Sequence, residues 1–595
     1  MKKRNILGLT TSGHGFSAAL CVEGKIVAAN SLERLSRKKY DILLPISKTD
    51  LNTFGWNDNP AIYKQHIDLP FDLEKDYSEV DFGKLEGFRR LMDHVLNAAG
   101  IGLDDIDCVA YSYRHNGNVK RFFEERIPGA EFIVPEHHLS HACQAFLPSP
   151  FEEAAVMVLD GQGVPMKRTG YDQLSGCLAQ GSGNRIETIV EFPVSASLGG
   201  LYAEVTRLCG FQTNEEGKTM GLAPYGTPKI YEQVKGEIRL GEGAGLRLRD
   251  LKRLFSPGDR PKEKLYSLGN CMGFLQKFEP RQKDEPFSDD HKDLAFMAQQ
   301  IVEDVMIYLA KWLREKTGSK NLCIAGGVGL NCVANFKVLD NSGFDSIFVY
   351  PSASDNGLAV GQALYIHNLV DGFERAYRTT HDYMGAPYTE TDIRKAVESC
   401  REDADVVITE FREMKPLYGT MAQAIETGKI TSWWQGRSEF GPRALGNRSI
   451  LADPRDPDMK DVLNSRVKFR ESYRPFTPSV LAERAGEFFE LNTPSPFMLL
   501  APGVKPGKEN VIPAVTHVDN TARVQTVTRD VNERYYDLIR EFEIHTGIPM
   551  VLNTSFSIAG EPIVESPQDA VRCFLSTGID VLGLDRFFIE KRTPE

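Results

Sequence analysis

The chain has 595 residues, of which 41% are hydrophobic and 26% are charged. This composition disfavours disordered, collagen-like and coiled-coil proteins, and the length predicts more than one domain. The formal net charge of −12 disfavours non-specific binding of nucleic acid, so we expect no nucleic-acid partner.

Cysteine usage and hydropathy indicate the compartment. The ten cysteines include no CxxC pair, which argues against a disulfide scaffold or a zinc ribbon and fits a reducing cytosol. The basic start of the chain leads into an apolar run that is too short and too polar for a signal peptide. Because no stretch approaches ~18 uncharged apolar residues, we expect no membrane partner and a cytoplasmic location.

Short strands and helices alternate through the first 380 residues. Residues 6–11 are typical of a buried strand that ends at a small-residue turn, and 16–22 with 25–30 are typical of a hairpin. Further strands are expected at 107–112, 155–160, 185–193, 321–325 and 347–350, and helices at 88–99, 198–208 and 294–316. Strands that end in Asp or Gly turns and lead into helices predict an α/β fold whose ligand lies at the carboxyl ends of strands. The sequence shows no clear internal repeat.

Three further stretches define the organisation of the chain. Residues 52–80 and 250–290 are polar and weakly periodic, so we interpret them as insertions. Residues 381–405 are polar and contain Pro and Gly, which predicts a linker. Residues 406–595 are long enough for a second α/β domain, with strands expected at 429–434 and 547–552.

The first candidate site is a group of histidines. His137 and His141 are four residues apart, so on a helix both imidazoles project from one face, a common way to hold a transition metal. Asp160 and Asp355 lie at or just after predicted strand ends and are candidates for the remaining ligands. The alternative is that each Asp only caps the next helix or turn, which is the commoner role of a lone Asp. Imidazole and carboxylate ligands together suit Fe(II), Mn(II) or Zn(II).

Glycine turns form the second candidate site. They occur at 161–163, 199–200 and 326–329, the last containing Gly326, Gly327 and Gly329. Glycines after strands let backbone N–H groups approach phosphates, although most single turns are only turns. Three in one domain predict a nucleotide cleft of the actin and sugar-kinase kind. The sequence contains no GxxxxGK[ST] P-loop.

The third candidate site is a block rich in Gly and Arg at 435–449, followed by 468–476, 521–523 and 553–557. Arginine forks and a lysine around glycine turns suit phosphorylated ligands. A solvated basic surface is the alternative, but such surfaces rarely interleave arginines with Gly, Pro, Phe and Asn.

The stretches 137–142, 217–226, 436–455 and 470–480 resemble the NodU/CmcH family of O-carbamoyltransferases, and the resemblance spans nearly the whole chain. It implies an N-terminal ASKHA-fold (actin/sugar-kinase-like), Kae/TsaD-like domain at 1–380, a linker at 381–405 and a C-terminal YrdC-like α/β domain at 406–595. It also implies two reactions. The second domain would make carbamoyl-adenylate from carbamoyl phosphate and ATP, with Mg, and the first would pass the carbamoyl group to an alcohol.

The resemblance also implies roles for individual residues. The metal ligands, usually to iron as Fe(II) in this family, would be His137, His141, Asp160 and Asp355. His14 would assist transfer. Carbamoyl phosphate and nucleotide in the second domain would be held by Arg443, Lys468, Arg470, Arg523 and Ser555. Nucleotide in the first domain would be held by Lys218, Gly326, Gly327, Gly329 and Asn331.

Two positions depart from the family pattern. Gly15 follows the first-turn histidine where the family often has an acidic residue or Asn. The SxN element of YrdC-type domains is Ser555-Phe556-Ser557 here, so we expect Asn553 or a water to replace the missing amide contact. Neither departure removes a residue that the mechanism must have.

Two other functions are alternatives to a small-molecule O-carbamoyltransferase. A tRNA threonylcarbamoyl transferase would need a basic RNA-binding face, which the acidic balance disfavours. A nucleotide-dependent regulatory protein of the ASKHA kind would not need the Arg/Lys/Ser constellation of the second domain. The acceptor is expected to be a hydroxylated small molecule of unspecified identity, and a homodimer is left open. We expect the two insertions to line the acceptor pocket, with a solvated elaboration or a dimer contact as an equal alternative.

Overall fold

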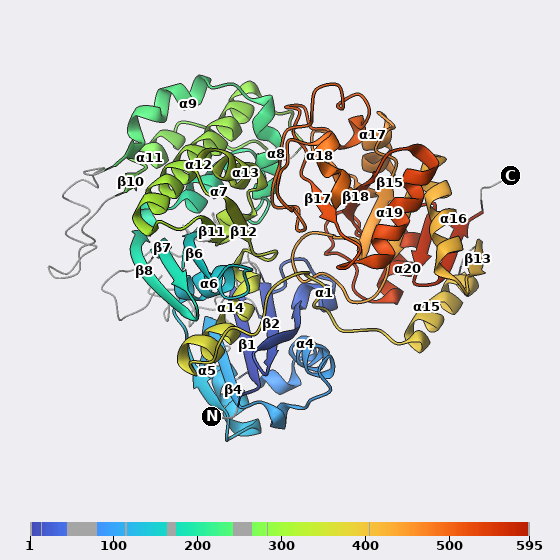
Figure 1. Ribbon diagram of the computed structural model, residues 1–595, viewed down its shortest axis with the longest axis horizontal. Helices are drawn as coiled ribbons and strands as arrows, with labels where there is room; N and C mark the ends of the chain where they lie inside the picture. Colours follow the sequence, from blue (N-terminus) through green and yellow to red (C-terminus); the bar gives the residue numbers. More distant parts are fainter. Residues whose placement is uncertain are drawn as a thin grey trace. The chain divides into compact units, whose positions relative to one another are not determined.

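A computed structural model describes residues 3–12, 15–44, 80–113, 116–163, 174–241, 265–282, 284–403 and 405–592 (Figure 1). His14, nearly all of 52–80 and the first part of 250–290 lie outside the described residues. The chain divides into two compact units. The first contains Met1–Leu32 and Tyr40–Thr379, and the second contains Glu33–Lys39 and Thr380–Glu595.

The first unit contains two five-stranded sheets, and the first of them has the strand order β3-β2-β1-β4-β5. Strand β1 pairs antiparallel with β2 and parallel with β4, so an antiparallel meander continues into parallel strands. The strands are β1 (Ile6–Ser12), β2 (Gly15–Val22), β3 (Lys25–Ser31), β4 (Cys108–Tyr113) and β5 (Glu131–Ile133).

The second sheet repeats this arrangement. Its order is β12-β11-β6-β7-β8, with β6 antiparallel to β7 and parallel to β11. The strands are β6 (Glu153–Leu159), β7 (Leu174–Ser182), β8 (Arg185–Pro193), β11 (Asn321–Ala325) and β12 (Ser346–Val349). The first unit therefore contains the same five-strand topology twice, although the sequence shows no repeat.

Two helices lie between these sheets (Figure 1). Helix α14 (Leu358–Leu364) packs on β1, β2 and β4, whereas α6 (His137–Phe146) packs on β6, β7 and β11, and the two helices contact each other. Gly8 of β1 permits this packing, because an added Cβ would lie 1.9 Å from the backbone oxygen of Ala359. The glycine in an otherwise apolar strand is thus explained by the close approach of a helix.

The longest helix of the first unit is α12 (Asp289–Thr317). It packs against α7 (Leu198–Leu208), α9 (Lys229–Val234) and α13 (Cys332–Asn341). It begins before the expected 294, because the Ser288 side chain caps it and accepts the N–H of His291. Further elements of the first unit are α4 (Glu86–Asn97), α5 (Asn116–Arg126), α8 (Glu216–Leu222), α11 (Cys271–Leu275), β9 (Arg239–Leu240) and β10 (Tyr266–Ser267).

The second unit is built on one eight-stranded sheet with the order β13-β20-β19-β14-β15-β18-β16-β17. Most neighbours are antiparallel, but β14 with β19 and β16 with β17 are parallel. The strands are β13 (Val406–Glu410), β14 (Thr431–Trp434), β15 (Arg448–Ala452), β16 (Thr477–Leu481), β17 (Gln525–Val527), β18 (Met550–Ser555), β19 (Val581–Leu584) and β20 (Phe587–Lys591).

Successive tryptophans of β14 show how both faces of this sheet are covered. Trp433 is buried in a core formed with α16 (Met414–Glu426) and α19 (Glu533–Thr546). Side chains alternate along a strand, so Trp434 points to the opposite face. There its ring lies 5.7 Å from that of Tyr388, and α20 (Pro567–Leu575) contacts β14 and β19.

The segment 381–405, for which the sequence predicts a linker, belongs to the second unit and contains helix α15 (Glu390–Asp403). The helix buries Ile393, Ala396, Val397 and Cys400, which have the spacing of one helix face. The Pro and Gly residues that suggest a linker lie before its start. Within the described ranges, none of the helices combines the length and apolar character that a membrane crossing requires.

Candidate functional site

Four buried side chains of the first unit meet in one place. His137 and His141 come from α6, Asp160 follows the end of β6, and Asp355 begins the short helix η8 (Asp355–Gly357) after β12. Each offers one ligand atom, and these atoms all lie within 4.8 Å of one another. We call these four residues the metal group.

The imidazoles of the metal group face its carboxylates. Nε2 of His137 lies 3.2 Å from Oδ2 of Asp160 and 3.7 Å from Oδ1 of Asp355. Nε2 of His141 lies 3.3 Å from Oδ1 of Asp355 and 3.9 Å from Oδ2 of Asp160. Helical spacing thus aims two nitrogen atoms at two oxygen atoms, and a divalent transition metal prefers such mixed donors.

The charges of this group depend on one another. Burial acts to lower the pKa of His137, but the hydrogen bond to Asp160 and the charges of Asp355 and Asp160 outweigh it and raise this pKa to about 9. Burial acts to raise the pKa of Asp160, but the hydrogen bond from His137 and the charges of His141 and His137 lower it below its usual range. The two carboxylates therefore favour positive charge between them.

Neighbouring groups hold the ligands in place. Gln144 Oε1 lies 2.7 Å from Nδ1 of His141 and thereby orients the Nε2 of that ring toward the carboxylates. The Gly327 N–H donates to Oδ1 of Asp160 at 3.0 Å. Gly326 has φ 89°, and an added Cβ there would lie 2.1 Å from the Leu159 backbone oxygen. The glycine turn after β11 is therefore shaped around Asp160.

The other residues expected to bind nucleotide in the first unit have protein partners. Asn331 caps α13 by accepting the Ala334 N–H at 3.0 Å, and its amide donates to Gln299 at 2.9 Å. Nζ of Lys218 lies 2.7 Å from a carboxylate oxygen of Glu215. An added Cβ at Gly329 would lie 3.3 Å from the Ala353 Cβ, closer than an ordinary van der Waals contact, so close packing accounts for this glycine.

A second buried charge lies in the second unit. Lys468 is 5% exposed, and its Nζ donates to the Ser557 backbone oxygen at 2.9 Å, to Ser555 Oγ at 3.2 Å and to the Ser555 backbone oxygen. Burial, followed by the charge of Arg470, lowers the pKa of Lys468 to about 7. A lysine held by neutral oxygens is poised to take an anion.

Further cations lie near Lys468. Burial, followed by the charges of Arg474 and Arg523, lowers the pKa of Arg470 to about 9. The Arg470 guanidinium donates to Asn464 at 3.1 Å and to the Pro475 backbone oxygen at 3.2 Å, and it lies over the Phe476 ring. We call Lys468, Arg470 and Arg523 the cation cluster. The structure brings Ser555 to this cluster as well.

Some arginines of the Gly/Arg block hold the fold together, and one remains a candidate for ligand binding. Arg448 is fully buried and donates to the backbone oxygen of Gln435 at 2.7 Å, while Arg437 donates to that of Met384 at 2.9 Å. These two forks hold the protein's own carbonyl groups. Asn553 likewise donates to Ser479 at 2.9 Å and to the Ala444 backbone oxygen at 3.1 Å. Arg443 is the arginine of this block for which the sequence predicts a ligand contact, and it is half-buried.

Comparison with known proteins decides the family. The model described as Carbamoyltransferase N-terminus matches residues 90–364, and the one described as Carbamoyltransferase C-terminus matches 422–591. Nodulation protein NolNO of Sinorhizobium fredii is 36% identical over 611 residues, which is 98% of this chain and 79% of that protein. The chain belongs to the carbamoyltransferase family.

Two further proteins are similar to this carbamoyltransferase to different degrees. The protein sll1178 of Synechocystis is 35% identical over 623 residues, which is 99% of this chain and 97% of that protein. HypF of T. kodakarensis aligns over 62% of this chain and 48% of its own at 12% identity, with a TM-score of 0.31, a likeness too weak to carry an argument. The metal group lies in the N-terminal match and the cation cluster in the C-terminal match.

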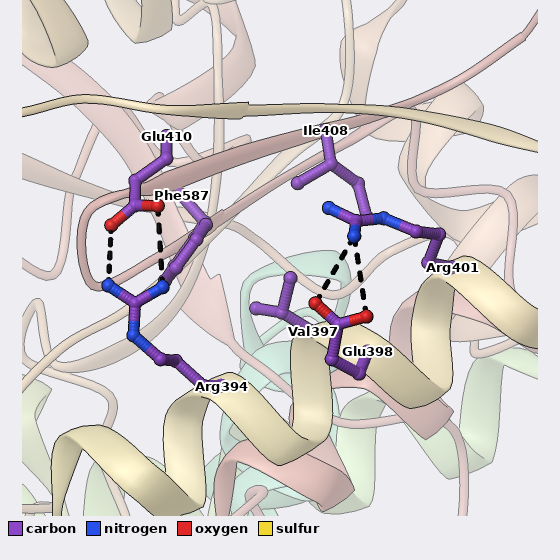
Figure 2. Close-up of a pocket in the computed structure, with 7 residues that line it drawn as sticks. All are labelled: Arg394, Val397, Glu398, Arg401, Ile408, Glu410 and Phe587. Carbon is purple, nitrogen blue, oxygen red and sulfur yellow. Dashed lines mark hydrogen bonds and ion pairs between the residues drawn. The ribbon is translucent and has the colours of Figure 1, made fainter.

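A pocket of about 290 Å³ on the second unit lies apart from these residues. Figure 2 shows its lining, which consists of Arg394, Val397, Glu398, Arg401, Ile408, Glu410 and Phe587. Its charges pair with each other, Arg394 with Glu410 and Arg401 with Glu398. The lining includes no residue of the metal group or of the cation cluster of this carbamoyltransferase.

Sequence reasoning missed two arginines that pack into the second unit. Arg34 and Arg37 lie far before the Gly/Arg block, yet both hydrogen-bond to loops of the second unit. Their signal in the sequence is weak, because a run of basic residues after a strand is usually a solvated surface.

Proposed function

We propose that this protein is an ATP-dependent O-carbamoyltransferase that uses carbamoyl phosphate and transfers the carbamoyl group to a hydroxyl of a small-molecule natural product. Family membership supplies the carbamoyl chemistry. The observation that carries the rest is the cation cluster, a buried lysine and arginine whose lowered pKa values favour a bound anion. A phosphorylated carbamoyl donor together with ATP provides such anions.

The first reaction belongs to the second unit, which we propose to be YrdC-like. Water releases carbamate and phosphate from carbamoyl phosphate, and a carbamate oxygen then displaces pyrophosphate from the α-phosphorus of ATP. The product, carbamoyl-adenylate, is a mixed anhydride with AMP as a good leaving group. Lys468 and Arg470 would hold the phosphates and offset the charge that develops on them. Arg443, Arg523 and Ser555 are proposed as further contacts, and ATP would carry Mg.

The second reaction belongs to the first unit, which we propose to be Kae/TsaD-like with an actin or sugar-kinase kind of fold. The duplicated five-strand sheets support this proposal. The acceptor hydroxyl attacks the carbamoyl carbon and AMP leaves, while His14 is proposed to accept the hydroxyl proton. Nucleotide would be held near the glycine turn at 326–329.

The metal group fits a transition-metal ion such as Fe(II), because its donors are two imidazoles and two carboxylates converging within 4.8 Å. A bound ion would supply Lewis-acid polarisation of an oxygen atom. His137 and His141 would hold it through Nε2, and Gln144 and the Gly327 N–H would fix the orientation of His141 and Asp160.

The test is the dependence of ATP cleavage on the donor. Purified protein incubated with ATP should form AMP and pyrophosphate only when carbamoyl phosphate is present. Addition of hydroxylated acceptors in a panel should then consume the carbamoyl group with release of AMP. Formation of ADP, or cleavage that does not need carbamoyl phosphate, would contradict the proposed function.

A further inference from the structure

A short segment of the N-terminal region belongs to the second unit. Strand β3 ends at Ser31 in the first unit, whereas Glu33–Lys39 packs with the second, and the chain rejoins the first unit at Tyr40. The segment includes all of helix α1 (Leu32–Ser36) except Leu32, and four basic residues, namely Arg34, Arg37, Lys38 and Lys39. We call Glu33–Lys39 the strap.

Arg34 of the strap holds the loop that carries Arg443. It is 2% exposed, and its guanidinium donates to the backbone oxygen of Gly441 at 2.7 Å. On the other side of this residue, the Gly441 N–H donates to Oδ2 of Asp382 at 2.7 Å. This hydrogen bond and the one from Gly441 to Asp382 hold the loop just before Arg443 from both sides.

Arg37 of the strap holds a different loop, 556–564, which follows Ser555. Its two terminal nitrogens donate to the backbone oxygens of Ile563 and Pro562, each at 2.7 Å, and one lies 3.3 Å from a Glu561 carboxylate oxygen. Arg37 has φ 63°, a region that costs free energy for residues other than glycine. The surrounding contacts therefore determine its conformation.

The loop held by Arg37 is also the loop that holds Lys468. Its base is closed by the Val564 N–H, which donates to the Phe556 backbone oxygen at 2.9 Å. At one end the Ser557 backbone oxygen accepts from Lys468 Nζ at 2.9 Å, and at the other end Arg37 binds the carbonyl groups of 562 and 563. A rigid support for such a site sets the position of its charged group.

We propose that the strap is a positioning element of the carbamoyl-donor site and that Arg37 is its principal positioning residue. Arg37 fixes the 556–564 loop, and this loop places Lys468 Nζ where the donor phosphate binds. The proposal rests on the proposed function, since it concerns the same adenylate-forming site. The proposed effect of Arg37 passes through the backbone oxygens of Ile563 and Pro562, to which its guanidinium donates.

The experiment measures carbamoyl-phosphate-dependent formation of AMP and pyrophosphate in full-length variants. Arg37→Ala should raise the KM for carbamoyl phosphate roughly tenfold, because a charge-assisted fork to the loop is lost, while kcat changes much less. Arg37→Lys keeps the cation but not the planar fork and should give an intermediate KM. Guanidinium ion added to Arg37→Ala should lower the KM again.

The matched control is Arg484→Ala, which removes an arginine paired with Glu487 and Glu543 of the same unit, away from this loop. Its KM for carbamoyl phosphate should equal that of the wild type. The proposal is overturned if Arg37→Ala and Arg37→Lys both have the wild-type KM, or if Arg484→Ala raises KM equally. A wild-type protein that forms no AMP from ATP and carbamoyl phosphate would overturn the proposed function and this inference together.

Discussion

The metal group and the cation cluster both contain buried ionisable side chains, but the metal group has an excess of negative charge and the cation cluster an excess of positive charge. In the metal group two carboxylates face two imidazoles, and the pKa of His137 rises to about 9. In the cation cluster Lys468 is held only by hydroxyl and backbone oxygens in its described hydrogen bonds, and its pKa falls to about 7. The first favours a cation and the second an anion, so one chain offers separate places for a metal and for phosphates.

This difference predicts that the two halves of the reaction can be broken independently. Replacing His14 by Asn should leave carbamoyl-phosphate-dependent ATP cleavage intact and reduce transfer to the acceptor by roughly 10²–10⁴-fold, the usual contribution of a general base. AMP release and carbamoylated product are measured in parallel. A His14→Asn protein that loses ATP cleavage would contradict the division of labour.

Lys468→Ala should break the other half. Loss of a buried charge that faces phosphates is expected to reduce adenylate formation roughly 10²–10³-fold, as for removal of a preorganised donor at a charged transition state. Carbamoyl-adenylate supplied from outside should still be used for transfer. If Lys468→Ala and His14→Asn failed at the same step, the two-site scheme would be wrong.

Substitutions in the metal group should remove its ion and leave the cation cluster of the second unit unaffected. His141→Ala removes one of two imidazole ligands, and metal analysis of the purified protein should show most of the metal gone. Gln144→Ala removes only the group that orients His141 and should weaken metal affinity roughly 10–100-fold. His545→Ala, which removes an imidazole that pairs with Glu426 in the second unit, is the control. Full metal occupancy in His141→Ala would contradict the assignment.

A smaller effect than that of removing Lys468 is expected from pH. Because the pKa of Lys468 is about 7, the side chain is increasingly neutral above that pH and binds phosphate less well. The KM for carbamoyl phosphate should rise by up to roughly tenfold per pH unit between pH 7 and 8.5. Lys468→Arg stays charged over this range, so its KM should be nearly constant. A wild-type KM that does not change with pH would contradict this role of Lys468.

Local patterns in the sequence predicted the metal group well. The spacing of His137 and His141 needs only a helix, and strand ends supply Asp160 and Asp355. The structure places all four together, although ligation itself stays a prediction. By contrast, the Pro and Gly residues before Glu390 favour a linker, whereas Glu390–Asp403 forms a helix with one apolar face.

Contacts between distant parts of the chain could not be predicted. Arg34 and Gly441 are separated by 407 positions, and Arg37 and Ile563 by 526. No periodicity links residues so far apart, since periodicity reports only the face of one element. The repeated sheet order was also invisible, because a buried strand requires apolar residues but not particular ones.

The strap has a consequence for recombination between members of this family. The chain passes from one unit to the other after Leu32, after Lys39 and after Thr379, so a single junction at 379/380 does not separate them. A chimera made at that junction would join the strap of one parent to the loops of another. Exchange of complete second units therefore requires that Glu33–Lys39 travel with the C-terminal part, and parents that differ at Arg34 or Arg37 would yield mismatched hybrids.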